Sequence, residues 1–483
     1  MSVTPDKIAA LVQKHYDALP AKRKPAVRAN GLREWVPMAG IVAEGNDNEL
    51  YCLSLATGMK CLPASKVPQA QGNVLHDWHA EVLAIRAFNC FVLDECKALL
   101  QGQPSEFLRW RTRDEIAAAA ANARGQEEGG GRWNAQPFTW KEESRLHMYC
   151  SEAPCGDASM ELIMASQEDA TPWDVPALTT AANITPDLLN TSTAPKTDTA
   201  ALEPALPGRA YFSHLGVVRR KPARSDAPPT LSKSCSDKLA LKQCTSLLSS
   251  AVTLLVDPRR VYLDTLVLPA SRYSEVACRR AFSAEGRMSS LSASREGGKR
   301  EITSSYAFRP FAVKTTTSEF SFSQRAVSLT ATPTAAAGSI APSNLAAAWT
   351  RSGLEETSLG GTLQGRKQFD PRGASFASRR KTWAVAAEVA GLLRELQEVE
   401  QDRDAQREGE GSKGSEGEDK DKQASCLAAA AAAEKIQGAL NVETYGEMKN
   451  SILLAPRKGI KEEAGRKALQ GWARNIGDES FTL

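Results

Sequence analysis

One short motif, His79-Ala80-Glu81, stands at the start of a stretch whose apolar residues recur at helical spacing. That spacing, which runs from Ala80 to Val92, predicts an amphipathic helix with Asp77 as a candidate cap. A second motif, Pro154-Cys155, follows a strand-like run at 145–151 and precedes a helix-like run at 160–164. Thiols at helix starts meet free backbone N–H groups and the positive end of the helix dipole, which favour the thiolate. A fold that uses both motifs has to bring two distant segments together.

The two motifs match parts of the zinc-deaminase pattern, His-x-Glu followed by Pro-Cys-x-x-Cys. In such sites an imidazole and thiolates occupy three tetrahedral positions of Zn²⁺, and the fourth holds water. The metal lowers the pKa of that water toward about 7. A nearby carboxylate that is not a ligand moves the proton to the ring nitrogen and the leaving amine. We therefore expect His79 and Cys155 to be metal ligands and Glu81 to be the proton shuttle.

The third ligand has to come from another segment, because Ala158 stands where the pattern has its second cysteine. Cys235, which precedes a short helix-like stretch, is the best candidate. Cys150 is the alternative, although its place in a strand-like run also fits a thiol that simply packs. We therefore predict a metal site of His79, Cys155 and Cys235.

The length of 483 residues fits either about three domains or one large domain with insertions. Strand-like runs at 35–43, 50–55, 253–256 and 260–268 alternate with helix-like runs, which favours one α/β core. We interpret 111–140, 165–208 and 325–345 as insertions and 401–433 as a disordered, low-complexity insertion. A single domain would then span 1–483.

The charge balance and the cysteines restrict the class of protein. Lys plus Arg number 60 against 57 Asp plus Glu, which excludes a polycation of the histone kind. Ten cysteines are too dilute for a disulfide scaffold, and neither a signal peptide nor a membrane span is recognisable. We expect a protein of the cytoplasm, the nucleus or both, with no membrane partner.

Three motifs, taken in their order along the chain, resemble those of the adenosine deaminases that act on RNA: His79-Ala-Glu81, Pro154-Cys-Gly-Asp157 and Cys235-Ser-Asp-Lys238. The loop Ala56-Thr-Gly-Met-Lys-Cys61 and the terminal Ser480-Phe-Thr-Leu483 are also similar to that family. The resemblance implies a cytidine-deaminase-like three-layer α/β fold, in which a mixed sheet is flanked by helices. It also implies zinc-dependent conversion of adenosine to inosine.

The segment 219–232 resembles the lead-in to the second cysteine in the tRNA-specific branch, and there is no room before His79 for a double-stranded-RNA-binding domain. This branch implies deamination on the 3′ side of the anticodon in alanine tRNA. Basic stretches at 22–24 and 219–221 are candidates to meet RNA phosphates. Alternatives are a deaminase of double-stranded RNA or of cytidine, and an inactive RNA-binding relative.

The family also holds a buried inositol hexakisphosphate, which needs many inward-facing basic side chains. The resemblance implies that Asp77 and Lys238 form a polar relay between this anion and the metal site. The positions that match its contacts are Arg86, Lys238, Arg379, Tyr445, Lys449, Lys458 and Trp472.

Overall fold

A computed structural model describes residues 3–112, 114–116, 118, 133–171, 206–208, 211–222, 227–292, 305–330, 340–409, 431–472 and 474–483. Its centre is a mixed sheet in the order β11-β10-β6-β2-β3-β13-β14-β15. The first three strands pair in parallel and the others antiparallel. The strands of this sheet are β2 (Met38–Glu44), β3 (Leu50–Thr57), β6 (Arg145–Cys150), β10 (Leu263–Pro269), β11 (Ala312–Thr316), β13 (Leu345–Thr350), β14 (Glu355–Leu359) and β15 (Thr362–Leu363).

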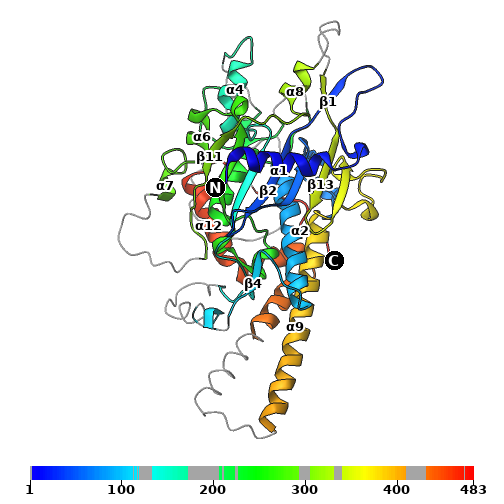
Figure 1. Ribbon diagram of the computed structural model, residues 1–483, viewed down its shortest axis with the longest axis vertical. Helices are drawn as coiled ribbons and strands as arrows, with labels where there is room; N and C mark the ends of the chain where they lie inside the picture. The colour runs from blue at the N-terminus through cyan, green and yellow to red at the C-terminus, as the bar shows by residue number, and fades with distance from the viewer. Residues whose placement is uncertain are drawn as a thin grey trace, which may run out of the picture.

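Helices cover both faces of the sheet, because alternate side chains of its strands point to opposite sides. Val42 and Leu55 belong to the apolar cluster beneath helix α1 (Pro5–Asp17), which crosses the front of the sheet in Figure 1. Ile41 faces the other way, toward the larger cluster that contains helix α2 (Ala80–Leu100). Leu53 joins this cluster too, because β3 has a β-bulge at that point, where the register of its pairing with β2 shifts. The predicted mixed α/β core is therefore confirmed.

The long helix α9 (Arg379–Gly409) packs along α2 and extends beyond the body of the protein (Figure 1). Other α-helices in the described part of the chain are α4 (Met160–Ala165), α5 (Cys235–Thr245), α6 (Glu275–Phe282), α7 (Ser289–Ser292), α8 (Gln324–Leu329), a helix at 431–440, α11 (Tyr445–Asn450) and α12 (Ala455–Lys467). In the described part of the chain, no helix is both long and apolar enough to cross a bilayer.

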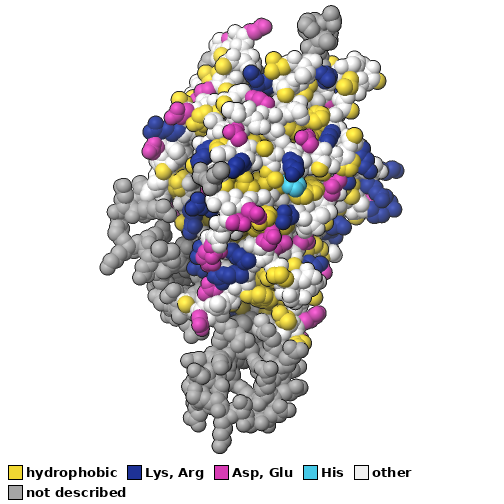
Figure 2. Space-filling model, viewed as in Figure 1, with side chains coloured by type: hydrophobic (Ala, Val, Ile, Leu, Met, Phe, Trp, Pro, Cys, Tyr) yellow, Lys and Arg dark blue, Asp and Glu magenta, His cyan; other side chains and the backbone are white. Residues whose placement is uncertain are grey.

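Three smaller sheets surround the core. They comprise β1 (Arg33–Trp35) with β12 (Ile340–Pro342), β4 (Leu108–Trp110) with β5 (Phe138–Trp140) and β9 (Val256–Asp257), and β7 (Leu206–Pro207) with β8 (Arg219–Arg220). On the face shown in Figure 2, basic side chains are interspersed with acidic ones, as the near-neutral net charge leads one to expect.

Several expected boundaries need correction. The end of the supposed insertion 111–140 belongs to the core, since Phe138 and Trp140 are fully buried in β5. The range 325–345 contains most of α8 and all of β12. The range 401–433 is not wholly disordered, because its first nine residues continue α9 and its last three begin a helix at 431–440. Residues 172–205 of the supposed insertion 165–208 lie outside the described residues.

The strand predicted at 253–256 also needs correction. Val252–Leu254 form one turn of 3₁₀-helix, and only Val256–Asp257 pair as a short strand. The run is fully buried on all sides, so its uniform apolar character carries no strand alternation.

The C-terminal segment contributes Phe481 to the main core cluster. The ring of Phe481 stacks on Tyr445, with centroids 4.8 Å apart, and rests against Gly72. Gly72 has a φ of +68°, and a Cβ there would lie 2.4 Å from the Phe481 ring. Glycine is therefore required at this position by conformation and by space.

We predict that Gly72→Ala lowers the free energy of unfolding by about 3 kcal/mol, because it combines left-handed backbone strain with a clash against a buried ring. Gly102→Ala is the matched control, since Gly102 has a φ of +75° and no neighbour within 4 Å. The control should lose only about 1 kcal/mol. Denaturant unfolding of both variants measures the difference, and equal losses would contradict the proposed contact.

Candidate active site

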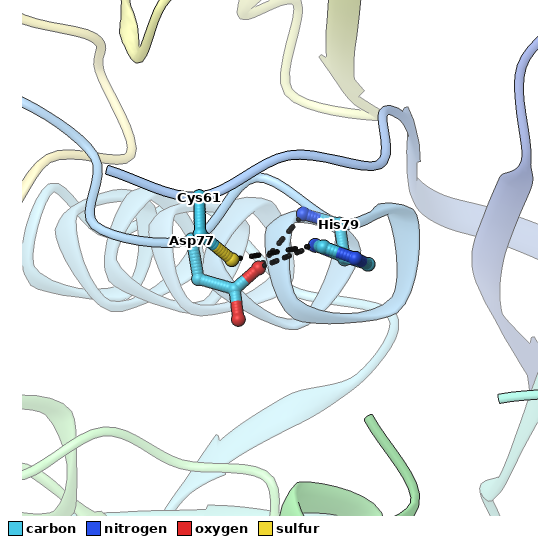
Figure 3. A group of neighbouring side chains, drawn as sticks. All are labelled: Cys61, Asp77 and His79. Atoms are coloured by element: carbon cyan, nitrogen blue, oxygen red, sulfur yellow. Dashed lines mark hydrogen bonds and ion pairs between the residues drawn. The ribbon is translucent and has the colours of Figure 1, made fainter. Parts of the chain in front are cut away.

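His79 stands at the N-terminus of α2 and is held there by Asp77. Asp77 Oδ1 accepts hydrogen bonds from the His79 backbone N–H at 3.0 Å and from Nδ1 at 2.9 Å. Cys61 Sγ lies 3.6 Å from the same Nδ1, and Figure 3 shows the three side chains converging. Their potential ligand atoms all lie within 4.8 Å of one another, so the group is compatible with a metal ion.

Asp77 is therefore not the cap that the helical pattern suggested. His79 itself occupies the cap position, and the Asp77 carboxylate instead orients the imidazole. A metal-binding histidine commonly donates its second nitrogen to such a carboxylate, which fixes the tautomer and the ring plane.

The two predicted cysteines lie together beside this histidine. The backbone N–H of Cys235 points at Cys155 Sγ, 3.4 Å away. The Cys155 thiol also makes side-chain hydrogen bonds with Cys235 and His79. The alternative, Cys150, is a buried residue of β6, and burial raises the pKa of its thiol well above the ordinary value. The structure thus brings together the three residues predicted from the motifs.

The two thiols differ in their surroundings. The hydrogen bond from Cys235, helped by Lys221 and His79, lowers the pKa of Cys155 well below its ordinary value in spite of burial. Burial and the neighbouring Cys155 raise the pKa of Cys235. Cys155 is partly exposed, whereas Cys235 is fully buried, so the site opens to solvent on the Cys155 side.

Glu81 completes the cluster from the first turn of α2. Its Oε2 lies 3.2 Å from Cys235 Sγ, and only 6% of the residue is exposed. Burial, with a contribution from Cys155, raises the pKa of the Glu81 carboxyl. A carboxyl whose pKa is raised in this way is suited to both accept and release a proton.

Sequence reasoning missed Lys221. Its Nζ donates to Asp77 Oδ2 at 2.8 Å and lies 3.2 Å from Cys235 Sγ. Burial alone would lower the pKa of Lys221, but Asp77 and Cys235 outweigh it and raise the pKa well above the ordinary value. The prediction that 219–221 meets RNA phosphates is wrong for Arg219 and Lys221, which are 1% and 6% exposed. No local pattern marks a lysine whose partners lie in other segments.

Lys238 connects this cluster to a cavity of about 240 Å³ beside α2. Its Nζ contacts Asp77 Oδ2 and donates to Ser232 Oγ at 2.6 Å, while its side chain also lines the cavity. Of the predicted anion contacts, Arg86, Lys238, Arg379, Tyr445 and Trp472 line this cavity. Lys449 and Lys458 do not line it: Lys449 donates to Ser250 Oγ at 3.1 Å, and Lys458 is exposed.

Four basic side chains, Arg86, Lys238, Lys242 and Arg379, line the cavity, and further cations lie close to Lys242. Burial and the neighbouring Arg457, Lys449 and Lys461 lower the pKa of Lys242 well below its ordinary value. Burial, followed by the charges of Lys461 and Arg457, lowers the pKa of Lys449 to about 7. Burial, followed by the charge of Arg457, lowers the pKa of Lys461 to about 8. A bound polyanion would reverse these shifts.

Comparison with known proteins agrees with this geometry. The family model for the adenosine-deaminase (editase) domain matches residues 54–408. The chain belongs to this family. The matched range runs from β3 to α9 and includes all the residues of the cluster around His79 and Cys235.

The chain is similar to several proteins named tRNA-specific adenosine deaminase 1, three of which illustrate the range. The Schizosaccharomyces pombe protein is 37% identical over 319 residues, which cover 66% of this chain and 69% of that protein. The Saccharomyces cerevisiae protein is 32% identical, over 55% of this chain and 58% of that protein. The Drosophila melanogaster protein is 28% identical, over 54% of each. The chain thus spans little more than half the length of the second and third relatives.

We predict that Lys221→Met raises the apparent pKa of Cys155 in metal-free protein, because a cation near the thiolate is lost. The measurement is the pH dependence of Cys155 alkylation, followed by peptide mass spectrometry. Lys97→Met is the control, since Lys97 pairs with the exposed Glu388. An unchanged pH profile in Lys221→Met would rule out the proposed effect of Lys221 on the thiolate.

Proposed function

We propose that this chain is a zinc-dependent tRNA adenosine deaminase that converts adenosine to inosine. The main support is that His79, Glu81, Cys155 and Cys235 meet in one largely buried cluster. These residues come from the starts of α2 and α5 and from the turn after β6. The names of the relatives support tRNA as the substrate. The sheet with helices on both faces supports a cytidine-deaminase-like three-layer fold.

The residues present fit a zinc ion. One imidazole and two thiols meet, the pKa of Cys155 is lowered, and Asp77 orients the ring of His79. This is the donor set of a catalytic zinc site that keeps a fourth position open. His79, Cys155 and Cys235 would hold the ion, which supplies Lewis acidity and lowers the pKa of water.

Glu81 would move the protons of the reaction. Because burial raises its pKa, the carboxyl can take a proton from the attacking water and deliver it to the ring nitrogen. It can then carry the second proton of that water to the amino group, which leaves as ammonia. Asp77 and Lys221 would act on the ligands: Asp77 holds the imidazole of His79, and Lys221 compensates the charge of Cys235.

We further propose alanine tRNA as the substrate, with the target adenosine on the 3′ side of the anticodon. This rests on the similarity of segment 219–232 to the tRNA-specific branch. An anticodon loop presents unpaired bases, so less energy is needed to extrude the target than in a duplex.

We also propose that the cavity beside α2 holds inositol hexakisphosphate, the polyanion expected from the family. Arg86, Lys238, Lys242 and Arg379 line it. The charge of Lys449 helps to lower the pKa of Lys242, so Lys449 lies close enough to act on the same anion. Asp77 and Lys238 would form the expected relay, since their side chains are in direct contact.

We predict that Glu81→Gln lowers kcat for inosine formation on alanine tRNA transcripts by about 10²- to 10⁴-fold, because the proton shuttle is lost. Zinc content should be unchanged, since Glu81 is not a proposed ligand. Glu388→Gln is the control at an exposed carboxylate on α9. Nucleoside mass spectrometry reads out the product. Normal inosine formation by Glu81→Gln would refute the mechanism, and deamination of cytidine alone would refute the substrate.

We predict that Lys449→Met raises the Tm of anion-free protein at pH 7 by about 3 °C and weakens the stabilisation by inositol hexakisphosphate. The pKa of Lys449 is about 7 when folded and about 10.5 when unfolded, so between these values the unfolded chain binds more protons. Anion-free wild type should therefore gain stability as the pH rises from 7 to 10, and Lys449→Met should gain less.

Thermal unfolding with and without the anion measures these effects. Lys458→Met is the control, because Lys458 is exposed and does not line the cavity. Equal responses of Lys449→Met and wild type to inositol hexakisphosphate would exclude Lys449 from the anion site.

A further inference from the structure

The two cysteine-bearing turns have the same arrangement, although they lie far apart in the sequence. Each proposed ligand is followed two residues later by an aspartate, Asp157 after Cys155 and Asp237 after Cys235. Both aspartates are fully buried. An aspartate that loses its partner in such a place keeps a large desolvation penalty, so the partners of these two side chains matter for the turns.

Asp157 Oδ1 accepts from the Gly216 N–H at 2.8 Å, and Asp237 Oδ2 accepts from Ser234 Oγ at 2.6 Å and from the Arg219 N–H at 2.9 Å. Each aspartate is also paired with an arginine, and the two arginines come from one short stretch of chain. Arg280, in α6, donates from Nε to Asp157 Oδ1 at 3.0 Å and from Nη2 to the Asp157 carbonyl at 2.9 Å. Arg287, just after α6, donates from Nη1 to Asp237 Oδ1 at 2.6 Å. Its side chain is 5% exposed, so this pair is shielded from solvent.

The two arginines are also fixed to each other through the backbone. The N–H of Arg287 donates to the carbonyl of Arg280 at 2.9 Å, and Arg287 Nε donates to the Ala281 carbonyl at 3.1 Å. The chain can fold back this closely because Gly286 lies between them. A Cβ at Gly286 would lie 2.3 Å from the Arg279 carbonyl and 2.4 Å from that of Arg280.

The turns themselves touch through short polar contacts. Ser236 Oγ donates to the Pro154 carbonyl at 2.9 Å and accepts from the Ala158 N–H at 3.1 Å. The Ser236 N–H donates to the Cys155 carbonyl at 3.0 Å. A small displacement of either turn therefore changes the separation of the two thiols.

We propose that Arg280 and Arg287 are positioning residues that hold the two cysteine turns at the separation a metal ion requires. Neither touches the proposed ligands, so they act through Asp157 and Asp237. This inference rests on the proposed function, because it takes Cys155 and Cys235 as zinc ligands. Residues behind metal ligands typically change metal affinity by about 10- to 100-fold when they are replaced.

The test compares Arg280→Gln, Arg287→Gln and the control Arg279→Gln. Arg279 is the neighbour of Arg280 in α6, but its side chain is 64% exposed and pairs with the exposed Glu285. Each full-length protein is loaded with Co²⁺ in place of zinc. The absorption bands of the cobalt–thiolate site report ligand geometry, a chelator measures the rate of metal loss, and unfolding measures stability.

We expect Arg280→Gln and Arg287→Gln to lose metal about tenfold faster than wild type or more, with altered cobalt bands. With zinc bound, kcat should fall while KM for tRNA stays the same, and Arg279→Gln should match wild type. A purely structural role would lower the Tm but leave the cobalt bands and metal loss unchanged. That result would overturn the proposal.

Two further comparisons keep the test decisive. If a Gln variant does not fold, Arg287→Lys replaces it, because lysine keeps the charge but not the planar fork. Faster metal loss in Arg287→Lys supports the proposal, and wild-type retention overturns it. Wild-type protein that binds neither zinc nor Co²⁺ would refute the proposed function as well, whereas normal wild-type binding with unaffected variants refutes only the inference.

Discussion

The buried carboxylate of Asp77 is the interaction on which the other parts of the site depend. It accepts from His79 on one oxygen and contacts Lys221, Lys238 and Ser232 on the other. The positive charges of the two lysines, together with His79, keep the pKa of Asp77 well below its ordinary value although burial would raise it. Lys221 also contacts Cys235, and Lys238 also lines the cavity. One carboxylate therefore positions a lysine at the proposed metal site and a lysine at the cavity. Its loss would leave two lysines facing each other without a counter-charge.

The sequence predicted well those features that depend on neighbouring residues. The strand before Cys155 and the helix from Met160 lie where the local pattern placed them. Ser234 caps α5 by accepting from the Asp237 N–H, which fixes Cys235 at a helix start. These signals are local because capping and strand alternation act over a few residues. Lys221 and Asp77 lie 144 residues apart in the sequence, and a contact at that separation leaves no local mark.

The net charge of the chain also conceals where its cations lie. A value of +3 suggests little about anions, yet several lysines face inward around one cavity. Burial lowers their pKa values, which means that the charged form of these lysines is unfavourable in the folded protein unless an anion is near. The C-terminal part supplies Tyr445 and Trp472 to this cavity, and both lie after the range matched by the family model. The core and the C-terminal segment therefore share one electrostatic requirement.

The exposure of the site restricts how a base can reach it. Cys155 and His79 are partly exposed, whereas Glu81 and Cys235 lie behind them with almost no exposed surface. A base stacked in a helix presents only its edges in the grooves, and its neighbours prevent a deep approach. An adenine has to leave its stack before its sixth carbon can come within hydrogen-bond reach of a carboxyl as buried as Glu81. The depth of Glu81 thus favours nucleotides that are already unpaired, as the bases of an anticodon loop are.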